Sequence, residues 1–396
     1  MTSLSNVPSI SPARYRATTY PSIRDADWDV WNGLRDVKSD PFMDPRFILA
    51  VENSMAADSR FRHVLIHDEQ GRPTAAACLC AYSVDGALLA EGGARTVATS
   101  IKKVAPFLLR VPVMLCGLPV SAGASHLRFA DHADRAAVLS ILDGLLCDFA
   151  KETRSKCIVF KEFEAAGCLE LVALESLGYR RADSLPMNCV PAGYSSFDDY
   201  LSRTNSARRR TIRRSKEKFA RCGLKVVHRA GGDGVDELFS DDVHRLYEAV
   251  LERATVRFER LPAAFFREVA RQMPDNSLFT FVNQGDRVVA FAATIFSEEL
   301  FDQMFIGLDY RLNPECDLYF NVFFEALGAA FDRGPRHIHV GQTSDEFKHQ
   351  KLTAYQIPLA MYVKGCAWLV NLFLKHRFEW FFPPRPLKYP APGGPG

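Results

Sequence analysis

The chain has 396 residues, which is enough for two domains, and its 47% apolar and 24% charged residues are typical of a soluble globular protein. Lys and Arg (49) nearly balance Asp and Glu (47), so the composition argues against a protein that mainly binds nucleic acid. The ten cysteines lack metal or disulfide spacing, the first thirty residues lack an apolar signal core, and no apolar run reaches about 18 residues. We therefore expect reduced thiols, a cytoplasmic location and no membrane-spanning helix.

The first half of the chain, after a loose tail (residues 1–12), alternates helical and strand-like patterns. Alternating apolar residues predict strands, and apolar residues three and four apart predict helices. The predicted elements are a strand at 15–20, helices at 27–34 and 44–57, a hairpin at 62–84, a strand at 111–118, a helix at 134–151, a strand at 157–160 and a helix at 167–178.

The second half repeats this order, with a helix at 261–273, a hairpin at 277–299, a strand at 301–309, a helix at 317–334 and a strand at 337–341. The repetition predicts a tandem duplication. Each unit is expected to be an α/β (mixed α+β) domain, a mixed sheet flanked by helices. We place the domains at 13–185 and 203–365, a linker at 186–202, an aromatic helix at 366–382 and a disordered tail at 383–396.

The segment from Arg203 to Arg221 carries nine Lys or Arg residues and only one acid, Glu217. It predicts a helix capped by Asn205 or Ser206, with a thin apolar stripe. The cations fit either a solvated surface or a cradle for a polyanion, because guanidinium groups bind phosphate in bidentate fashion. The candidate polyanion-binding residues are Arg209, Arg210 and Arg213.

Two segments carry a resemblance to a known family: FDDYLSRTNSARRRTIRR (197–214) and GQTSDEFKHQKLTAYQIP (341–358). Together with the duplicated order of elements, they resemble the FemAB-like, peptidoglycan-biosynthesis-related branch of the GNAT acyltransferase superfamily, over residues 15–365. The resemblance implies two tandem GNAT-like domains that transfer an acyl or aminoacyl group to an amine, in cell-envelope or polysaccharide biosynthesis. It implies no tightly bound cofactor, because the acyl donor is a co-substrate.

The donor could be an aminoacyl-tRNA, an acyl-carrier protein or an acyl-CoA. A superfamily member that uses acetyl-CoA usually has a Q/R-x-x-G-x-G/A loop before a helix, where backbone N–H groups bind the pyrophosphate. The corresponding segment of the second half, DYRLNPECDLYFN (309–321), has no glycine, and Gly117 and Gly123 of the first half are too far apart. The sequence therefore favours a larger, polyanionic donor, or a phosphorylated, lipid-linked acceptor.

The candidate catalytic residues follow strands of the second half, where such a sheet opens its cleft. Asp309 follows the strand QMFIGL, and Lys348 lies in the loop expected after HIHVG. We expect both to open on one cleft, with the Lys348 ammonium contacting a substrate phosphate or the oxygen that becomes negative during acyl transfer. Gln342, Thr343 and Tyr355 are candidate substrate-binding residues. The first half is expected to have lost or repurposed its site.

His337 and His339 alternate on one strand without a third metal ligand, so we interpret them as structural and expect no metal site.

The helix at 366–382 combines aromatic residues with Lys375, His376 and Arg377. It fits peripheral contact with the inner face of the membrane, packing against the second domain, or a homodimer contact. Monomer and homodimer both stay open. The alternatives to the main functional hypothesis are a conventional acetyl-CoA-dependent N-acetyltransferase and a non-enzymatic module that binds RNA or anionic lipid.

Overall fold

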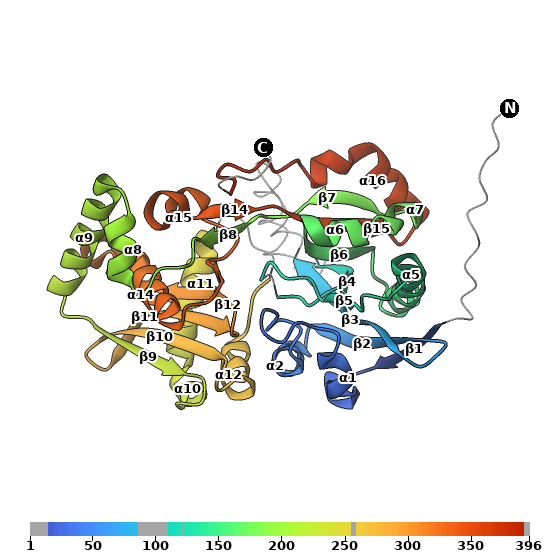
Figure 1. The fold of residues 1–396 in the computed structure, drawn as a ribbon, viewed down its shortest axis with the longest axis horizontal. Coiled ribbons are helices and arrows are strands. Elements are labelled where there is room, and N and C mark those ends of the chain that lie inside the picture. The colour runs from blue at the N-terminus through green and yellow to red at the C-terminus, as the bar shows by residue number, and fades with distance from the viewer. Residues whose placement is uncertain (1–14, 86–109, 121, 255–258, 392–396) are drawn as a thin grey trace.

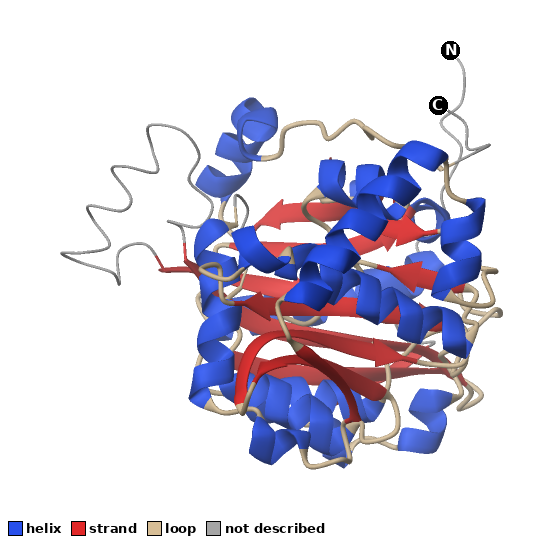
Figure 2. Ribbon diagram, turned by 90° about the vertical axis from the view of Figure 1, so that its left-hand side faces the viewer, coloured by secondary structure: helices blue, strands red, loops and turns tan. Residues whose placement is uncertain are grey.

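The computed structural model describes residues 15–85, 110–120, 122–254 and 259–391. Two mixed β-sheets lie side by side, one built mainly from each half of the chain (Figure 1). Helices cover the strands (Figure 2). The mixed α/β class and the tandem arrangement expected from the sequence are thereby confirmed.

The first sheet has the strand order β1-β2-β3-β4-β6-β15-β7, with β5 paired to β3. Its strands are β1 (Tyr15–Tyr20), β2 (Ser59–Asp68), β3 (Pro73–Asp85), β4 (Arg110–Cys116), β5 (Leu127–Phe129), β6 (Cys157–Glu164), β7 (Arg180–Asp183) and β15 (Leu359–Gly365). The helices of this half are η2 (Ile23–Asp25), α1 (Trp28–Asn32), α2 (Pro45–Met55), α5 (Arg135–Glu152), α6 (Ala165–Glu170) and α7 (Ala173–Ser176). The single helix predicted at 167–178 is therefore two short helices.

The second sheet has the order β14-β8-β13-β12-β11-β10-β9. Its strands are β8 (Met187–Val190), β9 (Lys225–Ala230), β10 (Ser277–Gln284), β11 (Arg287–Phe296), β12 (Leu300–Leu308), β13 (His337–His339) and β14 (Tyr355–Ile357). The accompanying helices are α8 (Phe197–Arg203), α9 (Ser206–Arg221), α10 (Val235–Leu238), α11 (Asp241–Arg253), α12 (Ala263–Gln272), α13 (Asn313–Cys316), α14 (Leu318–Arg333) and α15 (Asp345–Leu352). The last helix, α16 (Trp368–Phe381), packs against β15 of the first sheet (Figure 1).

The two sheets have matching orders but exchange one strand each. Strand β15, from the end of the chain, pairs with β6 and β7 in the first sheet. Strand β8, from the segment expected to be a linker, pairs with β13 and β14 in the second sheet. Residues 186–202 are therefore not a simple linker between the sheets, because β8 within this segment belongs to the second sheet and β15, far beyond it, completes the first.

The halves also share a hydrophobic core, in which α2 packs against α12. Polar contacts surround this packing: Asn53 Nδ2 donates to Glu268 at 2.7 Å, and Arg46 donates to Asn276 at 3.1 Å. The strand exchange and this common core join the two halves into one unit.

The arginine-rich helix α9 begins as the sequence predicts, because the Asn205 side chain accepts from Arg208 N. Ile212, Ser215 and Phe219 form its buried stripe. The segment after β13, by contrast, was expected to be a loop and contains the helix α15.

Residues 383–391, expected to be disordered, are an ordered segment that crosses from one sheet to the other. Arg385 N donates to Asp183 of β7, and Gln356 N of β14 donates to Tyr389 O. The Tyr389 ring stacks on His349 of α15 at 3.9 Å between centroids. The remainder of the predicted tail, 392–396, and the N-terminal tail lie outside the described residues.

Candidate active site

A fork between two parallel strands of the second sheet forms the candidate site. Strands β12 and β13 are paired up to Asp302 and His339. After His339, the chain that forms β13 leaves β12 and turns towards β8, where Val340 N donates to Asn188 O. The two strands therefore separate from Gln303 onwards and leave an opening in the sheet.

The opening leads into a cleft of about 310 Å³. Its apolar walls come mainly from α11, β12 and α14, including Tyr247, Leu251, Phe305, Tyr319 and Phe323. Its polar lining includes Glu259, Gln303, Gln342, Thr343 and Lys348. An aromatic cleft with a few convergent polar groups is the usual form of a small-ligand site.

Lys348 lies in the cleft wall, on α15, with only 3% of its surface exposed. Its Nζ donates to Gly341 O at 3.0 Å and lies 5.9 Å from the centre of the Phe323 ring. Burial in this apolar setting lowers the pKa of Lys348 from its ordinary 10.5 to about 7, against the opposing effect of Asp345 and Asp302. The amine is therefore divided between its charged and neutral forms near neutral pH.

Gly341 is required for this arrangement. Its φ of 82° lies in the left-handed region, and a Cβ there would lie 3.4 Å from Lys348 Nζ. Its carbonyl oxygen also accepts from Asn188 Nδ2 at 2.9 Å, so the group that orients Lys348 is itself fixed.

Gln303 was not identified from the sequence, although it lines the cleft. Its side-chain amide is buried, and neither its nitrogen nor its oxygen has a hydrogen-bond partner among the described residues. An unpartnered buried amide is costly, and a polar ligand group in the cleft would offset that cost. The signal in the sequence was the polar pair Asp302–Gln303 within an apolar strand.

Gln342 and Thr343 lie in the cleft lining, as expected. Gln342 donates to Leu185 O at 2.9 Å and so links the site to the end of the first half. Tyr355, by contrast, lies on β14 and is not part of the lining; it packs at the edge of a small apolar cluster with Met187 and Cys189.

Asp309 differs from the sequence-based expectation, because it lies outside the cleft lining. Its carboxylate pairs with Arg287 at 2.8 Å and with Arg311 at 2.9 Å. Hydrogen bonds from Arg311 lower the pKa of Asp309 to about 2, so the group is a poor proton acceptor near neutral pH. Asp309 therefore fixes the turn after β12, and we do not assign it a catalytic role.

The arginines of α9 do not line the cleft. Arg209 donates to the carbonyl oxygens of Leu201 and Ser202 at the end of α8, so its guanidinium already makes hydrogen bonds within the protein. Three exposed guanidiniums within about one turn of α9, at Arg210, Arg213 and Arg214, have no ion pair or hydrogen bond with any described residue. Together with Arg209 they border a shallow depression of about 400 Å³.

The start of α14, where the superfamily resemblance would place a donor pyrophosphate, is occupied by the protein's own groups. Asn313 Oδ1 accepts from Tyr319 N at 2.9 Å. Asp317, the residue before the helix, accepts from Lys218 of α9 at 2.8 Å. An acidic residue and a side-chain cap at this position disfavour a bound pyrophosphate.

The corresponding fork of the first sheet, between β4 and β6, is filled by side chains. Lys161 Nζ donates to Leu118 O and Val120 O at 3.1 and 3.0 Å. The Lys161 stem lies so close to Gly117 that a Cβ there would be 2.9 Å away. Glu162 follows in the left-handed region (φ 64°), as Gly341 does in the second half. The Lys161 side chain thus occupies this fork among the described residues, while the loss or repurposing of a site in the first half stays a prediction.

Within the described ranges we find no group of three or more His, Cys, Asp or Glu side chains placed to hold a metal ion. His339 is one of the two histidines that the sequence placed on one strand, and its Nδ1 lies 3.2 Å from Asp302 Oδ2. In the same part of the chain, no helix has the length and apolar character needed to cross a bilayer.

Comparisons with known proteins agree with the fold. A tandem GNAT protein from the clavulanic acid biosynthesis pathway aligns over 89% of this chain and 99% of its own, with 7% identity and a TM-score of 0.51. A conserved protein of unknown function from Bacteroides thetaiotaomicron aligns over 88% and 99%, with 11% identity and a TM-score of 0.50. FemX aligns over 79% and 89%, with 10% identity and a TM-score of 0.48.

No curated protein matches the sequence. The model of the FemAB-like family, described as peptidoglycan biosynthesis and recognition, matches residues 20–343. This match covers most of the chain, including most strands of both sheets and the fork between β12 and β13, and it ends before α15. The chain is therefore a member of the FemAB-like family and has the tandem GNAT fold.

Proposed function

We propose that this protein transfers an acyl or aminoacyl group to an amine in the cleft that holds Lys348. Membership of the FemAB-like family and the tandem GNAT fold support acyltransferase activity in general. The observation that carries the proposal is the buried lysine with a pKa of about 7, at the fork of the second sheet.

Acyl transfer to an amine requires a proton acceptor, because the attacking nitrogen must lose a proton as the C–N bond forms. A catalytic base works best when its pKa lies near the working pH. The neutral Lys348 amine fits this requirement, since an N–H bonded to Gly341 O leaves its lone pair free. Lys348 takes the proton from the acceptor nitrogen and returns it to the oxygen or sulfur of the departing donor, whose bond to the acyl carbon breaks.

The other polar groups of the cleft position the reactants. The free amide of Gln303 offers a donor and an acceptor to the acyl or aminoacyl group. Tyr319 and Phe323 supply an apolar wall that keeps water from the reacting carbonyl.

The donor that we propose is larger than acetyl-CoA and carries phosphates, such as an aminoacyl-tRNA or an acyl-carrier protein with its phosphopantetheine arm. The capped start of α14 disfavours a CoA pyrophosphate. The unpaired guanidiniums of Arg210, Arg213 and Arg214 suit phosphates of a ligand that extends beyond the cleft. A phosphorylated, lipid-linked acceptor would use the same guanidiniums.

A transfer assay tests this proposal. The purified protein is incubated with each donor class and a panel of amines, and new amide products are identified by mass spectrometry. For the productive pair, Lys348→Met is expected to lower kcat/KM by roughly 10²-fold or more. Lys351→Met, three residues along the same helix and outside the cleft lining, is the matched control. Equal losses in both variants, or product from none of the donors, would contradict the proposal.

A further inference from the structure

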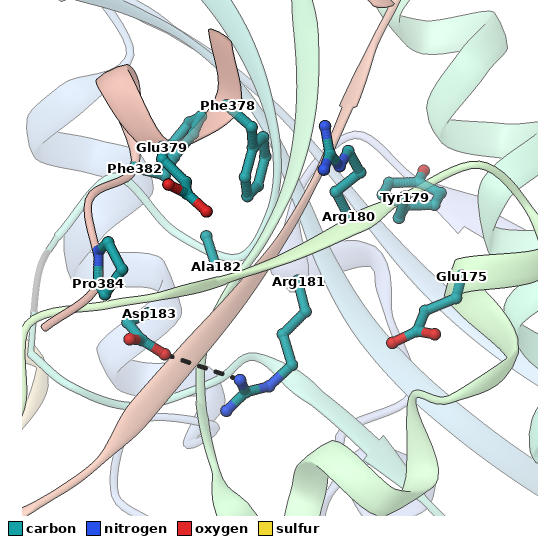
Figure 3. A pocket seen from close by; sticks show the side chains of 10 residues that line it. All are labelled: Glu175, Tyr179, Arg180, Arg181, Ala182, Asp183, Phe378, Glu379, Phe382 and Pro384. Carbon is teal, nitrogen blue, oxygen red and sulfur yellow. Dashed lines mark ion pairs between the residues drawn. The ribbon is translucent and has the colours of Figure 1, made fainter. Parts of the chain in front are cut away.

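The ordered segment after α16 (residues 383–391, here called the strap) connects the edge strands of the two sheets, β7 and β14. It begins beside β7, where Pro384 and Asp183 line one groove (Figure 3) and Arg385 N donates to Asp183 Oδ2 at 3.0 Å. It then runs back towards β14 and α15 (Figure 1). The strap therefore reaches the helix that carries Lys348.

A buried glutamine of β14 fixes the far end of the strap. Gln356 is 2% exposed, and its Oε1 accepts from Lys388 N at 2.8 Å and from Tyr389 N at 3.1 Å. Gln356 N in turn donates to Tyr389 O at 2.6 Å, and Gln356 and Pro390 form a parallel bridge. Because a buried amide needs its partners, these hydrogen bonds hold the backbone of Tyr389 in a defined position.

The Tyr389 ring is thereby placed against α15. It stacks on the His349 ring with 3.9 Å between the centroids and 5° between the planes. His349 Nδ1 donates to Ala354 O at 2.9 Å, and Ala354 N donates to Lys348 O at 3.1 Å. A continuous series of contacts therefore runs from the strap to the backbone of Lys348.

Helix α15 depends on contacts of this kind, because it is weak by itself. It has 8 residues, no side chain caps its start, and the residues at its two ends, Ser344 and Thr353, lie in the left-handed region (φ 61° and 56°). Helices this short are marginal without tertiary support. Phe347 stacks on Phe320 of α14 at 5.1 Å, and His349, about 200° further around the helix, meets the strap. The strap and α14 therefore hold α15 from opposite sides.

We propose that Tyr389 is a positioning residue for Lys348: the strap clamps α15 through His349 and keeps the Lys348 amine in the cleft wall, away from bulk water. Lys348 is 3% exposed, and its hydrogen bond to Gly341 O requires α15 to stay in place. This inference deepens the proposed function and rests on it for the effect on acyl transfer. The effect on the amine itself can be measured without any substrate.

The ionisable groups that act on the amine do not belong to the strap. They are Asp345 on α15, Asp302 on β12 and Cys189 on β8, and all three favour the charged form, whereas burial, the largest effect, lowers the pKa of Lys348. A substitution at Tyr389 therefore changes the amine only through the position of α15. Loosening this helix admits water, which stabilises the ammonium form and raises the pKa of Lys348.

NMR of lysine side chains in the full-length protein tests the inference. With ¹³C at the lysine Cε atoms, the Lys348 resonance is identified by its absence from Lys348→Met and is followed from pH 5.5 to 9.5. The wild-type midpoint is expected near 7. Tyr389→Ala should raise this midpoint by about one pH unit or more, and Tyr389→Phe, which keeps a ring for stacking, should shift it by no more than about 0.3 unit.

Two further variants complete the set. His349→Leu removes the other ring of the stack and should also raise the midpoint by about one pH unit or more. Tyr15→Ala is the matched control, because Tyr15 is also half-buried but lies on β1, at the opposite edge of the first sheet, and should leave the midpoint unchanged. The helix is expected to stay folded in all of them, since Arg208 of α9 donates to the carbonyl oxygens of His349 and Gln350.

Acyl transfer gives a second readout. With a midpoint one unit higher, the neutral fraction of the amine at pH 7 falls from about one half to about one tenth. Tyr389→Ala should therefore lower kcat/KM about five-fold at pH 7 and recover nearly the wild-type value at pH 9. A loss that is the same at both pH values would contradict a role that acts through the amine.

The NMR outcomes separate this inference from the proposed function. An unchanged midpoint in Tyr389→Ala or in His349→Leu would overturn the positioning role, as would an equal rise in Tyr15→Ala or Tyr389→Phe. A midpoint that rises as expected in a protein that transfers no acyl group would support the positioning role and contradict the proposed function alone.

Discussion

Replacing Lys348 by Met tests the unusual state of this lysine without any knowledge of the substrate. Methionine preserves the length and packing of the buried stem and removes the amine. The loss of the hydrogen bond from Lys348 Nζ to Gly341 O is tolerable, because Gly341 O keeps its hydrogen bonds from Asn188 N and Asn188 Nδ2. The substitution therefore isolates the energetic cost of burying an ammonium group.

The expected gain in folding stability follows from the lowered pKa of Lys348. Lowering the pKa from 10.5 in the unfolded chain to about 7 costs the folded state roughly 4–5 kcal/mol while the group is charged, at about 1.4 kcal/mol per pH unit. Between pH 7 and 10.5 the unfolded state binds more protons than the folded state, so the stability of the wild type rises with pH in that window. Lys348→Met should thus be about 4 kcal/mol more stable than the wild type at pH 6, and only about 2 kcal/mol more stable at pH 9.

Urea unfolding of both proteins at pH 6 and pH 9 measures this difference. Lys351→Met is the control, because Lys351 is half-exposed on the same helix and should change the free energy of unfolding by no more than about 0.5 kcal/mol at either pH. A Lys348→Met variant no more stable than the wild type at pH 6, or a gap that stays constant between the two pH values, would refute the lowered pKa.

Three further predictions concern the surroundings of the cleft. Replacing Arg210, Arg213 and Arg214 together by Ala should weaken tRNA binding in a gel-shift assay at several salt concentrations and change the free energy of unfolding by no more than about 0.5 kcal/mol. If tRNA affinity depends neither on these substitutions nor on the salt concentration, the helix has only a structural role. Asp309→Asn should cost about 1 kcal/mol of stability at pH 7, since its partners are largely exposed; because its pKa is lowered to about 2, the loss should vanish as the pH falls from about 4 towards 2, with transfer activity unaffected throughout. Calorimetry should show that acetyl-CoA binds with a Kd weaker than about 10 μM; tighter binding would restore a conventional acetyltransferase.

Local sequence patterns predicted most of the fold, because the elements of each half are long enough to show their periodicity. The helix at 134–151 appears as α5, and the hairpin at 277–299 appears as β10 and β11. Helix α15 was missed because Ser344, the residue before it, is in the left-handed region and makes no side-chain cap, and because the helix has almost no apolar face. The exchange of β8 and β15 could not be predicted, because strand pairing between distant segments leaves no local signal.

The candidate site was also predicted only in part, because the sequence shows which residues follow a strand but not which side chains they contact. The position of Lys348 after G-Q-T led to a residue that the structure places in the cleft, while its catalytic role stays a prediction. Asp309 was misplaced because its partner Arg287 lies across the hairpin, and the sequence does not show which residues pair across strands. Gln303 was missed because a polar residue in a strand looks the same whether its amide has a partner or not.

The pH dependence of acyl transfer is the most direct test of the central claim that Lys348 acts as a base. With the productive donor and amine, kcat/KM of the wild type is measured from pH 5.5 to 9 with saturating donor, together with that of Lys348→Met. The mechanism predicts a rate that rises with pH to a plateau with its midpoint near 7, and a variant that is roughly 10²-fold slower on the plateau and lacks this midpoint. A wild-type rate that is flat, or that falls as the pH rises through 7, would contradict the claim.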